Sequence, residues 1–260
     1  MLEAINLYKS YPAAGQKGKG TNAVNGVDLV LEDRMTYALV GESGSGKSTL
    51  SKMLTGLLPP TSGDVLLDGK SIFSLGRKES RLRFTQMQMV LQDSKSALDP
   101  RFTVYDSIAE PIRNLLNVPK QRERQMVAEL MNKMELPDSL MNRRPNELSG
   151  GQQKRVCIAR AISVSPQLVI FDEAMSGLDV IVRKSILELL KRLQEESGFT
   201  YLFITHDIDV ALYIADHILV MKEGKLVERV CYTGSIECFK HPYSRMLLDS
   251  LLPEYLGQNA

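Results

Sequence analysis

A glycine-rich segment, Gly41-Glu-Ser-Gly-Ser-Gly-Lys47-Ser48, places the strongest constraint on what this chain can fold into. It follows an apolar run at 36–40 that predicts a buried strand, and it precedes residues 47–57, whose apolar spacing predicts a helix. A strand, a glycine-rich turn and a helix in this order form a phosphate-binding loop, because the backbone N–H groups of the turn and the positive end of the helix dipole face an anion. We therefore predict an α/β fold in which this loop binds a nucleoside triphosphate.

Two side chains of this loop carry specific chemistry. Lys47 is expected to reach the β- and γ-phosphate oxygens, and the Ser48 hydroxyl is expected to ligate Mg²⁺. An ordinary glycine-rich turn is the alternative, but the flanking strand and helix are the context that a phosphate-binding loop requires. The residues predicted to contact the nucleotide here are Gly41, Glu42, Ser43, Gly44, Ser45, Gly46, Lys47, Ser48 and Thr49.

The overall composition argues against several classes of protein. A net charge of +1 provides no positive field that would hold nucleic acid, so we predict no nucleic-acid partner. The cysteines Cys157, Cys231 and Cys238 show no C-x-x-C spacing, which disfavours a disulfide framework or a zinc site and fits a reducing cytoplasm. No apolar run approaches the roughly 18 residues of a spanning helix, so any membrane role is expected to come through a partner protein.

Strand and helix signals alternate through much of the chain, which predicts a parallel sheet covered by helices. Residues 168–171 and 201–205 have the pattern of buried strands, and 217–230 that of a hairpin around Glu223-Gly224. Strand signals are scarce from 97 to 162, where apolar residues recur at helical spacing. We expect a nucleotide-binding core with an N-terminal β-layer at 1–95 and 163–235, a helical subdomain at 96–162 and a tail at 236–260.

Two adjacent carboxylates, Asp172 and Glu173, follow the apolar strand at 168–171. A parallel strand delivers the residues at its C-terminal end to the crevice where ligands bind, so this pair is expected beside the phosphates. We expect Asp172 to hold the Mg²⁺ shell and Glu173 to polarise a water molecule for in-line attack on the γ-phosphorus. A strand that merely ends in solvated acids is the alternative, and the phosphate-binding loop weighs against it. The predicted reaction is hydrolysis.

A second helix start, Leu148-Ser-Gly-Gly-Gln152, has the features of another anion site. Ser149 is a natural N-cap, and Gly150 and Gly151 allow the backbone to approach a γ-phosphate closely. Because the segment belongs to the helical insert, we expect it to be too remote for its own chain's nucleotide and to act on that of a second subunit. An ordinary capped helix start is the alternative.

With these motifs, the sequence resembles the ABC ATPase family, whose signature is Leu-Ser-Gly-Gly-Gln. The resemblance extends over nearly the whole chain. It implies a P-loop NTPase (RecA-like) core with a parallel sheet, an N-terminal antiparallel β-subdomain and an inserted α-helical subdomain. It also implies ATP hydrolysis coupled to transmembrane transport, with ATP and Mg²⁺ as cofactors, at the cytoplasmic face of the cell membrane.

The resemblance implies roles for single residues that spacing alone leaves ambiguous. Gln92 matches the glutamine loop that contacts Mg²⁺ or water in this family, and His206 matches the switch histidine that meets the γ-phosphate. The segment from Ser176 to Asp179 matches the loop that crosses the dimer interface, although the family more often has Ala in place of Gly177. The signature residues expected to contact the nucleotide are Ser149, Gly150, Gly151 and Gln152.

One aromatic residue also acquires a role from the resemblance. Tyr11 fits the residue that stacks on adenine in this family, with Tyr8 and Tyr37 as rival candidates. A tyrosine in a strand more often packs in the core, which is the alternative for all three. Beside the carboxylate pair, the usual family Pro-Thr is replaced by Ala174-Met175, which leaves both acids in place.

Two further stretches, 91–104 and the tail motif His241-Pro-Tyr-Ser-Arg245, resemble those of oligopeptide, dipeptide and nickel importers. In such importers two different ATPases usually pair with two transmembrane permease subunits and an extracytoplasmic solute-binding protein, so heterodimer and homodimer are both open here. The implied cargo is a peptide, nickel or a metal chelate. Cys231 and Cys238 are too few to hold an iron–sulfur cluster unaided, and His241 is expected to be structural rather than a nickel ligand.

Three other functions could use the same phosphate-binding loop. An exporter ATPase shares the same engine, and only the subfamily resemblance favours import. A soluble ABC ATPase acting on ribosomes or DNA usually carries tandem cassettes or long coiled-coil insertions, which are not visible in this sequence. A phosphate-transferring kinase has no use for the segment 148–152.

Overall fold

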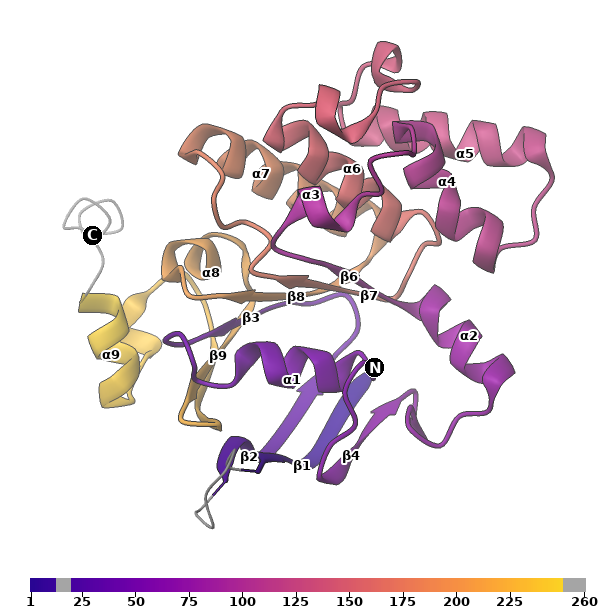
Figure 1. Cartoon of the computed structure of the whole chain (residues 1–260). Helices are drawn as coiled ribbons and strands as arrows, with labels where there is room; N and C mark the ends of the chain where they lie inside the picture. The colour runs from indigo at the N-terminus through magenta and orange to yellow at the C-terminus, as the bar shows by residue number, and fades with distance from the viewer. Residues whose placement is uncertain (13–19, 250–260) are drawn as a thin grey trace. The chain divides into compact units, whose positions relative to one another are not determined.

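The computed structural model describes residues 1–12 and 20–249 (Figure 1). These residues belong to two compact units. The first unit is Met1–Leu75 with Thr200–Ala260, and the second is Gly76–Phe199. The last part of the predicted tail, 250–260, lies outside the described residues. Within the described ranges, no helix combines the length and the apolar character needed to cross a membrane.

The first unit opens with an antiparallel sheet, whose strands in spatial order are β2 (Thr21–Leu31), β1 (Leu2–Tyr11), β4 (Ser62–Leu67) and β5 (Lys70–Ser71). Along β1, Leu2, Ala4 and Leu7 are buried, so the inward-facing positions change from even to odd numbers. The change occurs at a bulge around Asn6, where φ is +46° and the pairing with β2 shifts register. An extra residue moves the following side chains to the other face of a strand. This sheet is the predicted N-terminal β-layer.

The same unit holds parallel strands, with β8 (Thr200–Thr205) and β9 (His217–Lys222) on either side of β3 (Thr36–Val40). All of β3 is buried, as expected for a strand covered on both faces. β10 (Lys225–Cys231) runs antiparallel to β9, and Glu223 and Gly224 turn the chain with φ of +48° and +80°, as in two-residue hairpins. The predicted hairpin is thus confirmed. The described helices of this unit are α1 (Lys47–Leu54), α8 (Ile208–Ile214), the short η3 (Ile236–Cys238) and α9 (Pro242–Asp249).

The second unit contains the parallel strands β6 (Met87–Val90) and β7 (Leu168–Asp172) and a group of helices (Figure 1). The helices α4 (Val104–Leu115), α5 (Lys120–Lys133) and α6 (Gly150–Ile162) pack on one another and bury an apolar core. This helical region and the parallel strands confirm the predicted α/β class with an inserted helical part. Its helices are α2 (Arg77–Gln86), α3 (Ser94–Ala97), α4 (Val104–Leu115), α5 (Lys120–Lys133), η1 (Asp138–Leu140), η2 (Pro145–Glu147), α6 (Gly150–Ile162) and α7 (Val180–Ser197).

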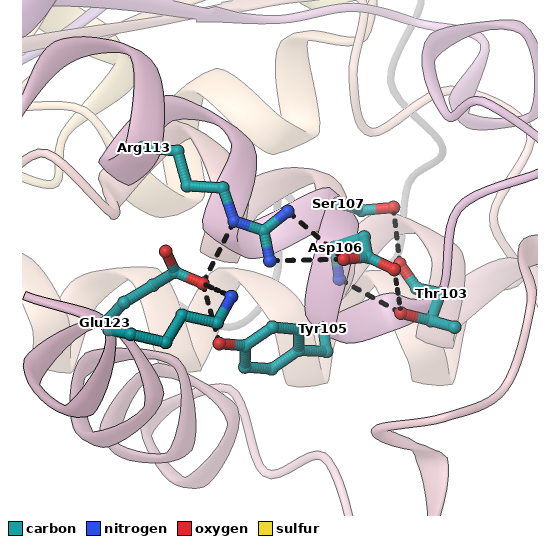
Figure 2. Close-up of polar contacts among 7 residues, drawn as sticks. Thr103, Tyr105, Asp106, Ser107, Arg113 and Glu123 are labelled. Atoms are coloured by element: carbon teal, nitrogen blue, oxygen red, sulfur yellow. Dashed lines mark hydrogen bonds and ion pairs between the residues drawn. The ribbon is translucent and has the colours of Figure 1, made fainter.

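A cluster of charged side chains fastens α4 to α5 (Figure 2). The Glu123 Oε1 atom accepts hydrogen bonds from Tyr105 Oη (2.6 Å), Lys120 Nζ (2.8 Å) and Arg113 Nε (3.0 Å), and Arg113 also pairs with Asp106 at 3.2 Å. The Glu123 side chain is only 5% exposed. Burial by itself would raise the pKa of Glu123, but the hydrogen bonds from Lys120, Tyr105 and Arg113 outweigh it and hold the pKa below its usual value. An ionised carboxylate therefore holds the two helices together.

We expect Glu123→Gln to lower the free energy of unfolding by about 2 kcal/mol at neutral pH, because three donors would lose a charged acceptor. The folded-state pKa of Glu123 is depressed, so its contribution is present above the ordinary value of 4.5 and is lost as the pH falls through the folded-state value. Denaturant unfolding at several pH values should show the difference from wild type shrinking in acid. Glu129→Gln in the same helix is the control, because Glu129 is 59% exposed and its contact with Arg122 is long, at 3.4 Å. Equal losses in both variants would contradict this role.

Candidate functional site

The glycine-rich loop lies in the first unit, between the end of β3 and the start of α1. Gly46 precedes the helix with φ +106°, and a Cβ atom there would lie 2.1 Å from the carbonyl oxygen of Ala23. Only glycine fits this position, because a side chain would bring both backbone strain and that collision. The first turn of α1 begins at this loop, and its leading N–H groups have no partner within the helix.

Lys47 folds back onto the loop. Its Nζ atom donates to the carbonyl oxygens of Gly41 (2.7 Å) and Glu42 (2.8 Å), and the residue is 4% exposed. A buried ammonium group requires such partners, so the loop and the side chain hold each other in place. A positive charge is thereby fixed beside the N-terminus of α1, and this combination favours a phosphate group.

His206 follows the end of β8 and lies beside the same loop, because β8 and β3 are neighbouring strands. Val40 is opposite Thr205 in the parallel register, so Gly41 and His206 follow adjacent strand ends at one edge of the sheet. His206 is exposed. The first unit therefore brings the glycine-rich loop and His206 together.

The three tyrosines proposed for adenine stacking differ in exposure. Tyr11 ends β1 and is 42% exposed, whereas Tyr8 is half-buried and Tyr37 is fully buried. Stacking requires an accessible ring face, so Tyr37 is unsuitable and Tyr11 is the better candidate. Among the residues that the structure describes, no hydrogen bond or ion pair joins Tyr11 to the glycine-rich loop.

In the second unit, Gln92 comes close to the carboxylate pair. β6 and β7 are parallel with Val90 opposite Phe171, so Gln92, Asp172 and Glu173 lie at or just beyond adjacent strand ends. Asp172 is buried and Glu173 is half-buried. Glu173 has φ +48°, a left-handed conformation that costs about 1–2 kcal/mol for a residue with a side chain. Strain of this kind is concentrated at functional sites, where it fixes a side-chain direction.

The N-terminus of α6 presents the predicted signature segment to solvent. Ser149 and Gln152 form a capping box, in which the Ser149 amide donates to Gln152 Oε1 (3.0 Å) and the Gln152 amide donates to Ser149 Oγ (3.3 Å). Gly150 is exposed, with open space where a Cβ atom would stand. The segment thus has the exposed helix start that an anion site needs.

Asp179 lies near this segment because both contact Val182. Asp179 Oδ1 accepts a hydrogen bond from the Val182 N–H (2.9 Å) and so caps α7. At Gly151 a Cβ atom would come within 2.8 Å of Val182 Cγ1, so glycine allows α6 and α7 to pack closely. The second unit therefore brings the signature segment and the Asp179 loop together.

No motif singles out Lys154, yet this residue ties α6 to the segment that carries Gln92. Lys154 is 2% exposed, and its Nζ atom donates to the carbonyl oxygens of Gln92 (2.8 Å) and Leu91 (3.0 Å). Burial lowers the pKa of Lys154. Farther along the same helix, Arg160 Nη1 donates to the Ala97 carbonyl (2.6 Å). Lys154 lies on the buried face of α6, and a cationic residue on that face is the signal by which the sequence could have indicated a buried polar contact.

In the part of the chain that the structure describes, no three His, Cys, Asp or Glu side chains lie close enough together to hold a metal ion.

The three cysteines are free thiols: Cys157 is buried, Cys231 is exposed and Cys238 is half-buried. The His241 Nδ1 atom accepts a hydrogen bond from the Tyr243 amide (3.2 Å).

Known proteins are similar to this chain over most of its length. The ABC transporter family matches residues 24–176. The nickel import ATP-binding protein NikE of Brucella suis biovar 1 (strain 1330) is 39% identical over 249 residues, which cover 96% of this chain and 93% of that protein. A dimeric post-hydrolysis structure of the ATP-binding cassette MJ0796 bound to ADP and Pi has a TM-score of 0.80 at 30% identity, and the match covers 90% of this chain and 100% of that chain.

A second solved structure supports the same assignment. This is cbiO1 from Clostridium perfringens, described as part of the ABC transporter complex cbiONQ. It has a TM-score of 0.77 at 31% identity, and the match covers 88% of this chain and 87% of that chain. The predicted P-loop NTPase fold is confirmed, and the chain belongs to the ABC transporter family, among its ATP-binding subunits.

Proposed function

We propose that this chain is the ATP-hydrolysing subunit that powers the import of a small solute through a membrane ABC transporter. The observation that carries the proposal is Lys47, a buried ammonium group fixed on a glycine-rich loop at the start of a helix. Similarity to an ATP-binding import protein over nearly the whole chain supports both the nucleotide and the direction of transport.

In the proposed reaction, water attacks the γ-phosphorus in line with the leaving ADP. Glu173 accepts a proton from that water, the bond from the γ-phosphorus to the bridging oxygen breaks, and ADP and phosphate are released. Lys47 and His206 contact γ-phosphate oxygens as charge develops on them, and Gln92 orients the water or the metal. The loop 41–49 holds the phosphates through its backbone amides.

The donor atoms at the strand and helix ends suit Mg²⁺. Ser48, Gln92 and Asp172 offer a hydroxyl, an amide oxygen and a carboxylate, and Mg²⁺ prefers such oxygen ligands together with water and phosphate oxygens. When bound, Mg²⁺ would neutralise part of the negative charge of the phosphates. Tyr11, with its exposed ring, stacks on the adenine of the same ATP.

Two ATPase subunits act together in this proposal. The exposed segment from Ser149 to Gln152 meets the nucleotide of the second subunit, and Asp179 crosses the interface beside it. The dimeric state of the similar cassette MJ0796 supports such a pair. The second subunit is either another copy of this chain or a different ATPase.

The membrane components follow from the importer class. Transmembrane permease subunits hold the ATPase pair at the cytoplasmic face of the membrane as a peripheral component, an extracytoplasmic solute-binding protein delivers the cargo, and no nucleic acid takes part. The cargo is a peptide, nickel or a metal chelate. Among these, the similarity to the nickel import protein NikE favours nickel. Within the chain, 1–95 and 163–235 form the nucleotide-binding core, 96–162 the helical subdomain and 236–260 the tail.

The test is Mg²⁺-dependent phosphate release from ATP, measured for the purified chain and for the chain assembled with its permease subunits. Size-exclusion chromatography with and without ATP reports the oligomeric state. ATP-driven dimers with activity support a homodimer, and activity that appears only with a different ATPase subunit supports a heterodimer. A chain that neither binds nor hydrolyses ATP in any assembly would contradict the proposal.

Lys154 provides a more specific prediction for this reaction. Lys154→Met is expected to lower kcat about tenfold, because the backbone that carries Gln92 would lose its donor and Gln92 would be less well positioned. The KM for ATP should change by less than about twofold, since the phosphate-binding loop is untouched. Arg160→Met is the matched control, because it removes a similar contact to the carbonyl of Ala97 instead. Steady-state kinetics measures kcat and KM for both variants. An equal loss of kcat in the two would attribute the effect to the general packing of α6.

A further inference from the structure

The tail motif from His241 to Arg245 takes no part in the chemistry proposed above, yet the structure packs it firmly in the first unit. The Glu228 Oε1 atom accepts a hydrogen bond from the His241 amide (2.9 Å), and His241 Nδ1 in turn accepts one from the Tyr243 amide (3.2 Å). Ser244 is fully buried. These contacts fix the backbone at the start of α9.

Tyr243 reaches the phosphate-binding loop from this position. Its hydroxyl accepts a hydrogen bond from the Glu42 N–H (3.0 Å), the residue is only 5% exposed, and Lys222 Nζ lies 4.8 Å from its ring centroid. On the other side of the same residue, the Glu42 carbonyl accepts from Lys47 Nζ (2.8 Å) and from the Ser45 N–H (3.2 Å). Glu42 is therefore held through both its amide and its carbonyl group.

We propose that Tyr243 is a positioning residue for nucleotide binding, which fixes the phosphate-binding loop through the Glu42 amide. A loop that already has its bound geometry loses less conformational entropy when it takes up a phosphate group, so its affinity is higher. Without the Tyr243 hydroxyl, the Glu42 amide would bond to water and the loop would open more often. The role in binding rests on the proposed function, whereas the contact that fixes the loop does not.

Tyr243→Phe tests this proposal, because it removes the hydroxyl and keeps the ring. Tyr37→Phe is the matched control: Tyr37 is also buried in the first unit, and its hydroxyl also accepts from a backbone N–H, that of Glu32 at 3.0 Å. Hydrogen exchange without nucleotide should become at least about threefold faster in the peptide that contains 41–46 in Tyr243→Phe, but not in Tyr37→Phe. The Kd for MgATP should rise about fivefold in Tyr243→Phe alone, the effect of one lost hydrogen bond, with kcat within about twofold of wild type.

Each contrary outcome has a distinct meaning. Unchanged exchange of the 41–46 peptide in Tyr243→Phe would overturn the proposal, whether or not the chain binds ATP. Equal rises in Kd for both tyrosine variants would also overturn it, because a general loss of stability would then account for the effect. A wild-type chain that fails to bind MgATP would contradict the proposed function, and the exchange experiment would still decide whether Tyr243 fixes the loop.

Discussion

Glu173→Gln is expected to lower kcat for ATP hydrolysis by about a hundredfold or more, because the amide cannot accept a proton from the attacking water. ATP binding should persist, since the change leaves the glycine-rich loop 41–49 and its Lys47 side chain as they are. In the proposed dimer, the γ-phosphate between the two subunits would then remain uncleaved. ATP-bound dimers should therefore accumulate in the variant, as an earlier elution in size-exclusion chromatography with MgATP.

A matched control for Glu173 is available in the β9–β10 turn. Glu223 has the same φ of +48° as Glu173, so Glu223→Gln makes the same chemical change on the same kind of backbone. Its kcat should stay within about twofold of wild type, because the Glu223 carboxylate is exposed and is not among the residues proposed to contact the nucleotide or the attacking water. Wild-type turnover in Glu173→Gln, or equal losses in both variants, would remove Glu173 from the role of general base.

Lys47→Met is expected to weaken MgATP binding about a hundredfold, because a charge-assisted contact to the phosphates would be lost. Methionine keeps most of the apolar stem of lysine, and the buried ammonium, which needs two carbonyl partners, would no longer have to be desolvated. Thermal unfolding without nucleotide should therefore occur at or above the wild-type temperature. Stabilisation by added MgATP should disappear.

Lys52→Met in the same helix is the control for Lys47. Lys52 is exposed and faces away from the buried side of α1, so its loss should change the Kd for MgATP by less than about twofold. Equilibrium titration with MgATP checks both variants. Equal weakening in the two would indicate a general effect of net charge, and unchanged binding in Lys47→Met would contradict the phosphate-binding role of the loop.

Local patterns predict much of this fold correctly. β3 and β7 are short buried runs, and α5 and α7 repeat apolar residues on one face, because backbone geometry dictates which side chains share a surface. Element ends are less well predicted. The helix expected at 47–57 ends at Leu54, since Gly56 adopts φ +70° and stops it, as glycine commonly does after a helix.

In the candidate site, too, residues that act together with their neighbours in the chain can be predicted from the sequence, whereas residues brought together by the strand order cannot. The glycine-rich loop and the capped start at Ser149 can be recognised because phosphate binding demands glycine and a helix N-terminus within a few residues. For Gln92 and His206, the strand order was needed to bring each beside a neighbouring strand end. Their roles came from family resemblance rather than from spacing.

The sequence by itself predicted the main elements and the glycine-rich loop, because each depends on residues close together in the chain, and its separate motifs together predicted ATP hydrolysis. Only the tertiary structure decided that Tyr243 holds Glu42, 201 residues away, and that Lys154 holds the backbone of Gln92, 62 residues away. Such contacts produce no periodic pattern in the sequence. The partner of a buried polar group depends on how distant elements pack and not on its neighbours in the chain.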